Sequence, residues 1–179
     1  MKISCAKDVL LSGIQNVQSV VSAKEALPIL LNVLIEAEGK NIFLSTTDLE
    51  IGIKCGIEAD VKRKGGTTIP AKKLFNIVRN FPADSIEIDV TENNIATIAS
   101  KNDSFKIMGL SEGDFPKIPE LKGAPAFTVK KDTLKDLIRK TSYAVSQEET
   151  RYSLNGIFVK VLGQFSYYHH VYHPRTLRY

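Results

Sequence analysis

The sequence lacks several residue patterns on which enzymes and membrane proteins depend. All three histidines (His169, His170 and His173) lie at the C-terminal end, so the body has no imidazole for general-base catalysis, a Ser-His-Asp triad or a zinc site. It contains neither a G-x-x-x-x-G-K-[ST] loop nor a G-x-G-x-x-G motif, and no apolar run is long enough to span a membrane. We therefore expect no enzyme, no cofactor, no metal site and no membrane partner.

Cysteine is also scarce. The two cysteines, Cys5 and Cys55, each continue an alternation of apolar residues, which favours two buried thiols over a disulfide. The N-terminus lacks the apolar core of a signal peptide, because Lys7 and Asp8 interrupt it. These features predict a cytoplasmic protein.

The positive charge is confined to one end of the chain. Lys and Arg total 24, Asp and Glu total 20, and the net charge is +4. The last acidic residue is Glu149, and the residues beyond it include Arg151, Lys160, Arg175 and Arg178, which account for the whole excess. The body is neutral overall, so any binding of nucleic acid must use a local stripe of basic residues.

Hydrophobic spacing predicts two helices among many strands. Leu10, Ile14, Val17 and Val21 mark one face of a helix over 7–21. A second helix follows Pro70, carries Leu74, Ile77, Val78 and Phe81 on one face, and ends at Pro82. Alternating or β-rich segments predict strands at 1–5, 29–37, 42–46, 50–61, 86–90, 95–99 and 105–107, with Gly65-Gly66 as a loop. The pattern is that of an α+β fold, with two helices packed on one face of a curved antiparallel sheet.

The residue pattern of the N-terminal part then recurs further along the chain. Leu134, Ile138, Thr141 and Val145 repeat the first helical face at a constant offset, and 154–158 align with 31–35. The second copy is incomplete and stops near Val161. We therefore divide the chain into a first repeat (1–120), a linker (121–125), a partial second repeat (126–161) and an irregular tail (162–179) of the kind that out-of-frame translation produces.

Basic residues gather on the predicted helices. The second helix carries Lys72, Lys73 and Arg79, and Lys131, Lys135 and Lys140 fall on one side of the third. A solvated helix face explains such residues as well as a nucleic-acid surface does. The charge alone supports weak contact with phosphates that does not depend on the base sequence.

Several segments in matching order and spacing resemble one family. Over residues 1 to about 160 the chain is similar to the N-terminal part of the bacterial sliding clamp, the β subunit of DNA polymerase III. The resembling segments are Met1-Lys2-Ile3, Leu27-Pro28-Ile29-Leu30, Thr47-Asp48-Leu49-Glu50, Ile69-Pro70-Ala71-Lys72-Lys73-Leu74-Phe75, Asp114-Phe115-Pro116 and Arg151-Tyr152-Ser153-Leu154-Asn155-Gly156.

The resemblance implies a DNA-clamp fold and a non-catalytic processivity factor. Subunits of this family have three repeats, and two subunits close head-to-tail into a ring. Double-stranded DNA passes through the ring, which tethers the replicative DNA polymerase. Any polymerase activity belongs to the holoenzyme, and the clamp loader is a further partner.

The resemblance also implies roles for individual residues. Lys24 and Lys73 match positions that touch the DNA backbone, and Arg151 and Tyr152 match a DNA-contacting loop of the second repeat. Phe105 and Ile107 match the edge strand that meets the partner subunit. Leu154 matches one wall of the pocket that receives polymerase and clamp-loader peptides.

The sequence departs from the family after the second repeat begins. Where the family has a Thr-Asp-Gly segment that helps to build the peptide pocket, this chain has Gln164-Phe165-Ser166-Tyr167-Tyr168. Ser153 is small where the family is often bulky. We therefore expect a truncated chain with an incomplete pocket that does not close a ring. The alternative is a small DNA-binding or regulatory module derived from a clamp.

Overall fold

The computed structural model describes residues 1–21, 27–100, 103–118, 128–146, 155–162 and 166–169. The chain divides into two compact units, Met1–Glu120 and Leu121–Tyr179.

The first unit contains nine strands and two α-helices among its described residues. In chain order these are β1 (Lys2–Ala6), α1 (Lys7–Gln18), β2 (Asn32–Glu38), β3 (Asn41–Thr47), β4 (Gly52–Glu58), β5 (Asp60–Arg63), β6 (Gly65–Pro70), α2 (Ala71–Asn80), β7 (Ser85–Val90), β8 (Ile95–Ala99) and β9 (Ser104–Met108). Short 3-10 helices, η1 (Pro28–Leu31) and η2 (Glu112–Asp114), precede β2 and follow β9.

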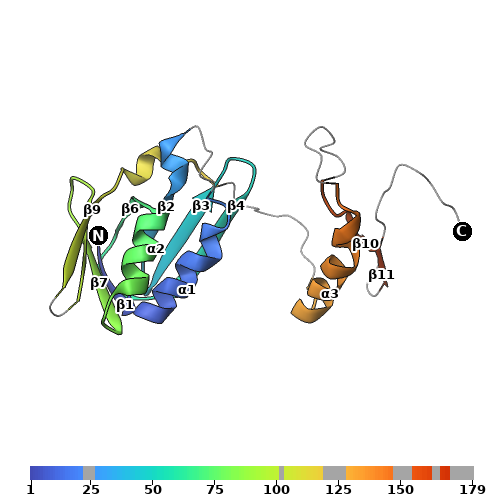
Figure 1. Ribbon diagram of the computed structural model, residues 1–179, viewed down its shortest axis with the longest axis horizontal. Helices are drawn as coiled ribbons and strands as arrows, with labels where there is room; N and C mark the ends of the chain where they lie inside the picture. The colour runs from blue at the N-terminus through green and yellow to red at the C-terminus, as the bar shows by residue number, and fades with distance from the viewer. Residues whose placement is uncertain (22–26, 101–102, 119–127, 147–154, 163–165, 170–179) are drawn as a thin grey trace, which may run out of the picture. The chain divides into compact units, whose positions relative to one another are not determined.

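The strands form two antiparallel sheets. One has the order β5-β1-β7-β8-β9 and the other the order β4-β3-β2-β6. Helices α1 and α2 lie next to each other (Figure 1) and contact each other. The predicted α+β class is confirmed. We expected a single sheet, but the structure has two, because strands that follow one another in the chain are divided between the two sheets.

The segment expected as one strand over 50–61 is where the chain changes sheet. β4 pairs with β3 in the four-stranded sheet, whereas β5 pairs with β1 in the five-stranded sheet. The loop expected at Gly65-Gly66 is wrong, because β6 begins at Gly65 and pairs with β2. Gly65 has a φ of +137°, which side chains rarely allow, and this conformation turns the chain directly from β5 into β6.

Two further boundaries differ from the predictions. The first helix ends at Gln18 rather than 21, and the Thr46 hydroxyl donates to the Val17 carbonyl in its last turn at 2.6 Å. The β-rich segment expected over 29–37 begins with the 3-10 turn η1, which Pro28 starts, and β2 follows it from Asn32.

The predicted helical faces supply much of the core. Leu10, Ile14 and Val17 are buried on α1, and Leu74 and Val78 are buried on α2. Cys5 is buried as expected, whereas Cys55 is only partly buried, because it lies on the edge strand β4. Both cysteines are free thiols.

The segment after β9 packs on the four-stranded sheet. Leu110 forms a β-bridge with Thr68 of β6, Phe115 is buried, and Ile118 lies against Gly52 at the start of β4. The segment therefore belongs to the first unit as far as its last described residue, Ile118. The expected linker, 121–125, lies outside the described residues.

The second unit contains α3 (Lys131–Thr141), a 3-10 turn η3 (Ser142–Ala144) and a hairpin of β10 (Val159–Leu162) and β11 (Ser166–His169). The third helix is confirmed. The strand expected in 154–158 starts at Val159 instead. The expectation of an irregular tail is wrong for 166–169, because Tyr167 and Tyr168 are strong strand formers and the segment pairs with β10.

Candidate nucleic-acid interface

The outer face of α2 presents three basic side chains. Ala71, Leu74 and Val78 are buried, so the opposite positions, Lys72, Lys73 and Arg79, are exposed. Among the described residues, neither Lys72 nor Lys73 forms an ion pair with a carboxylate. The Arg79 guanidinium lies over the Phe75 ring, 5.3 Å from its centroid, a contact that leaves its donors open to an anion. This helix face can therefore contact phosphates.

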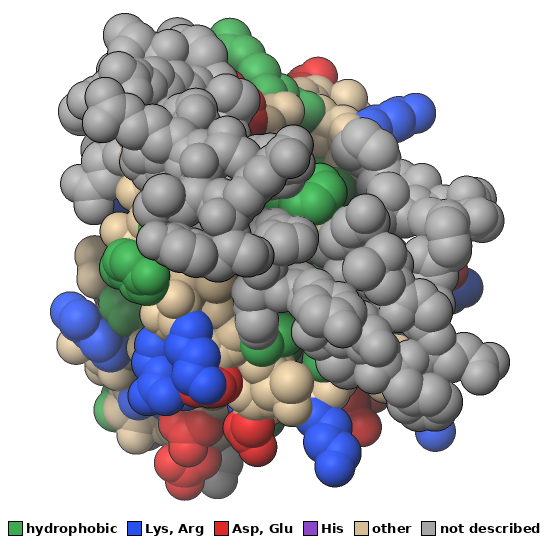
Figure 2. Space-filling model, turned by 90° about the vertical axis from the view of Figure 1, so that its right-hand side faces the viewer, with side chains coloured by type: hydrophobic (Ala, Val, Ile, Leu, Met, Phe, Trp, Pro, Cys, Tyr) green, Lys and Arg blue, Asp and Glu red, His purple; other side chains and the backbone are tan. Residues whose placement is uncertain are grey.

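Basic side chains on the five-stranded sheet are engaged differently. Lys2 and Lys62 lie 3.3 and 3.1 Å from Glu87, and Arg63 lies 2.7 Å from Asp89. The Lys62 and Lys2 ammonium groups lower the pKa of Glu87, and Glu87 and Asp89 raise the pKa of Lys2. This ladder across β5, β1 and β7 has three basic and two acidic side chains, so most of its positive charge is neutralised. On the face shown in Figure 2, basic and acidic side chains are likewise interspersed.

Lys7 also has a structural partner. Its ammonium group donates to the Phe81 carbonyl at 2.6 Å, just beyond the C-terminal end of α2. The positive charge therefore lies at the negative end of the helix dipole. Lys7 is therefore not among the basic residues that could contact DNA.

The third helix carries a partly neutralised basic face. Lys140 and Arg139 lie 2.8 and 2.7 Å from Asp136 and lower the pKa of that carboxyl. Lys131 and Lys135 are exposed on the same helix. The apolar positions Leu134 and Ile138 are 38% and 47% exposed, whereas their counterparts Leu10 and Ile14 in the first unit are fully buried.

The edge strand β9 carries both residues expected at a subunit interface. Phe105 is 48% exposed, and its ring meets the Phe81 ring edge-on, with centroids 5.6 Å apart. Ile107 is 6% exposed and belongs to the core. β9 pairs with β8 on one side, and no strand in the described part of the chain pairs with its other side. The structure thus places Phe105 at the surface of this edge strand and Ile107 in the core.

Four expected site residues lie outside the described residues: Lys24, Arg151, Tyr152 and Leu154. Lys73 is exposed on α2 as described above. The family resemblance did not mark Lys72 and Arg79 as DNA contacts, although helical spacing places both on the polar face of the second helix. The contact between the Phe81 and Phe105 rings had no signal in the sequence, since the two residues are far apart in the chain.

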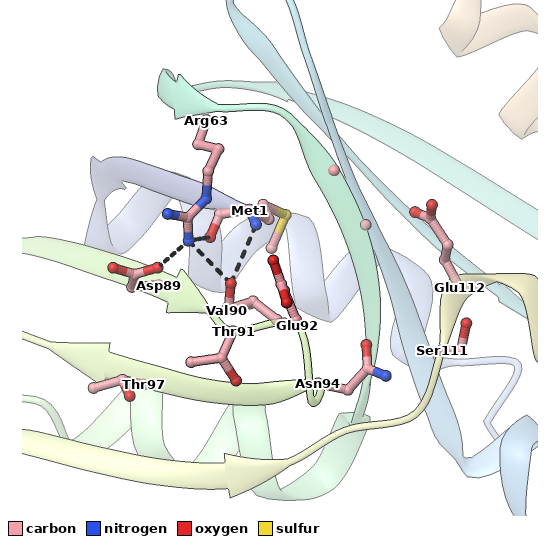
Figure 3. A pocket seen from close by; sticks show the side chains of 12 residues that line it. Met1, Arg63, Asp89, Val90, Thr91, Glu92, Asn94, Thr97, Ser111 and Glu112 are labelled. Atoms are coloured by element: carbon pink, nitrogen blue, oxygen red, sulfur yellow. Dashed lines mark hydrogen bonds and ion pairs between the residues drawn. The ribbon is translucent and has the colours of Figure 1, made fainter.

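A polar cavity of about 820 Å³ lies where the two sheets meet. Figure 3 shows Arg63 bonded to Asp89, to the Val90 carbonyl and to the Met1 carbonyl, at 2.7, 3.1 and 3.4 Å. The Met1 ammonium group donates to the Val90 carbonyl at 3.2 Å, and burial together with Arg63 lowers its pKa. The contacts join β1, β5 and β7, so their role is structural. Within the described ranges, no cluster of His, Cys, Asp and Glu could hold a metal ion.

No helix in the described part of the chain is long and apolar enough to cross a membrane.

The arrangement of paired sheets, a helix pair and an open edge strand is that of the DNA-clamp class. The solved sliding clamp of Caulobacter crescentus is similar, with a TM-score of 0.84 and 34% identity over 92% of this chain and 45% of that one. The Bacillus subtilis clamp has a TM-score of 0.83 and 29% identity, covering 88% of this chain and 43% of that one.

The model of the DNA polymerase III beta subunit N-terminal domain matches residues 1–119. The beta sliding clamp of Chlamydia muridarum is 34% identical over 161 residues, covering 90% of this chain and 44% of that protein. This chain belongs to the DNA polymerase III beta subunit family. It spans less than half the length of the curated relatives that it matches.

Proposed function

We propose that this chain provides the first repeat of a DNA sliding clamp, which holds double-stranded DNA without reading its sequence and keeps a replicative polymerase on its template. The observation that carries the proposal is the exposed basic face of α2. Lys72 and Lys73 lack carboxylate partners among the described residues, whereas Lys2, Lys62 and Arg63 on the five-stranded sheet are paired.

The function is mechanical and has no bond-making step, so the chain acts as a processivity factor rather than an enzyme. A clamp must let DNA slide, which requires few and weak phosphate contacts. Three charges on α2 would contribute a slope of about −2.7 to the dependence of log K on log salt. Lys24, Lys73, Arg151 and Tyr152 form the proposed DNA contacts.

The proposed partners are a second clamp chain, a replicative polymerase and a clamp loader, in the cytoplasm. Phe105 and Ile107 form the subunit edge, and Leu154 belongs to the peptide pocket. The proposed organisation remains a first repeat over 1–120, a linker over 121–125, a partial second repeat over 126–161 and a tail over 162–179. The division of the chain into compact units near residue 120 supports the first of these boundaries.

Binding to a labelled DNA duplex at several salt concentrations tests the DNA contacts. The double variant Lys72→Gln/Lys73→Gln should flatten the salt slope by about 2, because each lysine that neutralises a phosphate contributes about 0.9. The matched control is Lys54→Gln/Lys62→Gln, which removes the same charge from lysines paired with Glu36 and Glu87. Equal slopes for the two double variants would contradict the proposal.

One observation favours the second candidate function, a small clamp-derived regulatory module. The β9 edge is open, and Phe105 is half-exposed on it, so the chain could cap a full-length clamp. A pull-down with a full-length sliding clamp, using Phe105→Ala as the comparison, tests this function. Absence of capture by the unaltered chain would exclude it.

A further inference from the structure

Phe81 connects the end of the helix pair to the edge strand. It follows α2 directly, and its backbone amide donates to the Val78 carbonyl at 3.3 Å. Its side chain is 1% exposed, and its ring meets Phe105 at an interplanar angle of 70°. An edge-to-face pair of this kind favours one relative orientation of the two rings.

Lys7 holds the backbone of Phe81. Lys7 is the first residue of α1, and its backbone amide donates to the Asp84 carbonyl at 2.8 Å. Its ammonium group donates to the Phe81 carbonyl at 2.6 Å in a partly buried position. Two bonds from one residue therefore tie the start of α1 to the segment that follows α2, and they fix the backbone that carries the Phe81 ring.

Phe105 needs such a support. It pairs with Ile98 of β8 on one side, whereas no strand among the described residues lies on the other side of β9. A phenylalanine that is 48% exposed on an edge would otherwise sample several rotamers. Binding a partner would then cost the entropy of selecting one of them.

We propose that Phe81, held by Lys7, is a positioning residue that presents the Phe105 ring to a partner clamp chain in a single orientation. The inference rests on the proposed role of Phe105 at a subunit edge. Under this proposal the helix pair and the edge strand are structurally coupled, because the contacts run from the start of α1 through the end of α2 to β9. A substitution at Lys7 or Phe81 would then change association without touching the partner.

The first measurement needs no partner. The chain contains no tryptophan, so Phe105→Trp places a single indole reporter at the edge. In the full chain, adding Phe81→Leu should raise the rate constant for acrylamide quenching of this indole about twofold, because the ring that restrains it is lost. Lys7→Met should act in the same direction. Phe75→Leu, which alters another α2 aromatic, is the matched control. Quenching unaffected by Phe81→Leu overturns the inference and leaves the proposed clamp function intact.

The second measurement is a double-mutant cycle for association with the full-length Chlamydia muridarum sliding clamp. Phe81→Leu should weaken association about threefold to tenfold on its own and add almost nothing in the presence of Phe105→Leu. Additive losses would show that Phe81 acts only through general stability, and they would overturn the inference. If Phe105→Leu itself has no effect on association, the proposed subunit edge fails, and the positioning role fails with it.

Discussion

Leu110 and Thr68 exchange two backbone hydrogen bonds, each of 3.0 Å. Thr68 lies in β6 of the four-stranded sheet, and Leu110 follows β9, the edge of the five-stranded sheet. The Thr68 hydroxyl accepts from the Asn32 amide at 3.0 Å and lies 3.3 Å from the Leu110 carbonyl, to which it can donate. This buried polar junction joins the two sheets of the first unit.

Removing the Thr68 hydroxyl should destabilise the first unit. Thr68→Val keeps the shape of the side chain but leaves the buried Asn32 amide without its acceptor, which costs about 1–3 kcal/mol. Denaturant unfolding measures the loss. Thr91→Val is the control, because Thr91 is exposed and its hydroxyl makes only a 3.5 Å contact. A Thr68→Val variant as stable as the control would show that the junction contributes little.

Gly109 lies beside the same junction and leaves no room for a side chain. A β-carbon there would overlap the Thr68 carbonyl oxygen and lie 3.0 Å from the Thr67 hydroxyl. Because backbone in a bonded bridge cannot move aside cheaply, Gly109→Ala should cost about 1–3 kcal/mol of unfolding free energy. Gly113→Ala should be well tolerated, since its nearest neighbour is Ser111 Oγ at 3.6 Å. Similar denaturant-unfolding midpoints for the two variants would contradict the predicted steric overlap at Gly109.

The Cys5 thiol should make stability depend on alkaline pH. Burial raises the pKa of Cys5 to about 11, from an ordinary value of 9.0. Above pH 9 the unfolded chain loses this proton while the folded chain keeps it, so stability falls as the pH rises towards 11. The loss is on the order of 2 kcal/mol. Comparing the pH slope of the unfolding free energy with that of Cys5→Ala isolates the thiol, because other groups titrate in both proteins. Identical slopes would contradict the prediction.

The second unit should be cleaved by proteases before the first. Leu134 and Ile138 of α3 are 38% and 47% exposed, whereas the corresponding Leu10 and Ile14 of α1 are fully buried. Because a helix with an uncovered apolar face gains little from packing, it opens locally at low cost. Limited proteolysis followed by mass spectrometry should give early cuts within 126–179 and a persistent fragment ending near 120. Equal protection of both parts would argue against this difference.

Part of the candidate site was predictable from spacing alone. Lys73 had to lie on the solvent face of α2, because Leu74 and Val78 occupy the core face at helical spacing. Local spacing gave no sign that the side chain of Lys7, the first residue of α1, has a structural partner. Its ammonium group bonds to the Phe81 carbonyl, a partner 74 residues away that no local pattern indicates.

The sequence by itself determined the periodic features of this protein: two amphipathic helices and a set of alternating strands. These features depend on residues that are only a few positions apart, so they can be predicted directly from the sequence. Only the tertiary structure decided that β4 and β5 belong to different sheets, that Thr68 meets Leu110 and that the rings of Phe81 and Phe105 are in contact. Such contacts arise from pairing between distant segments, which depends on the packing of the whole first unit.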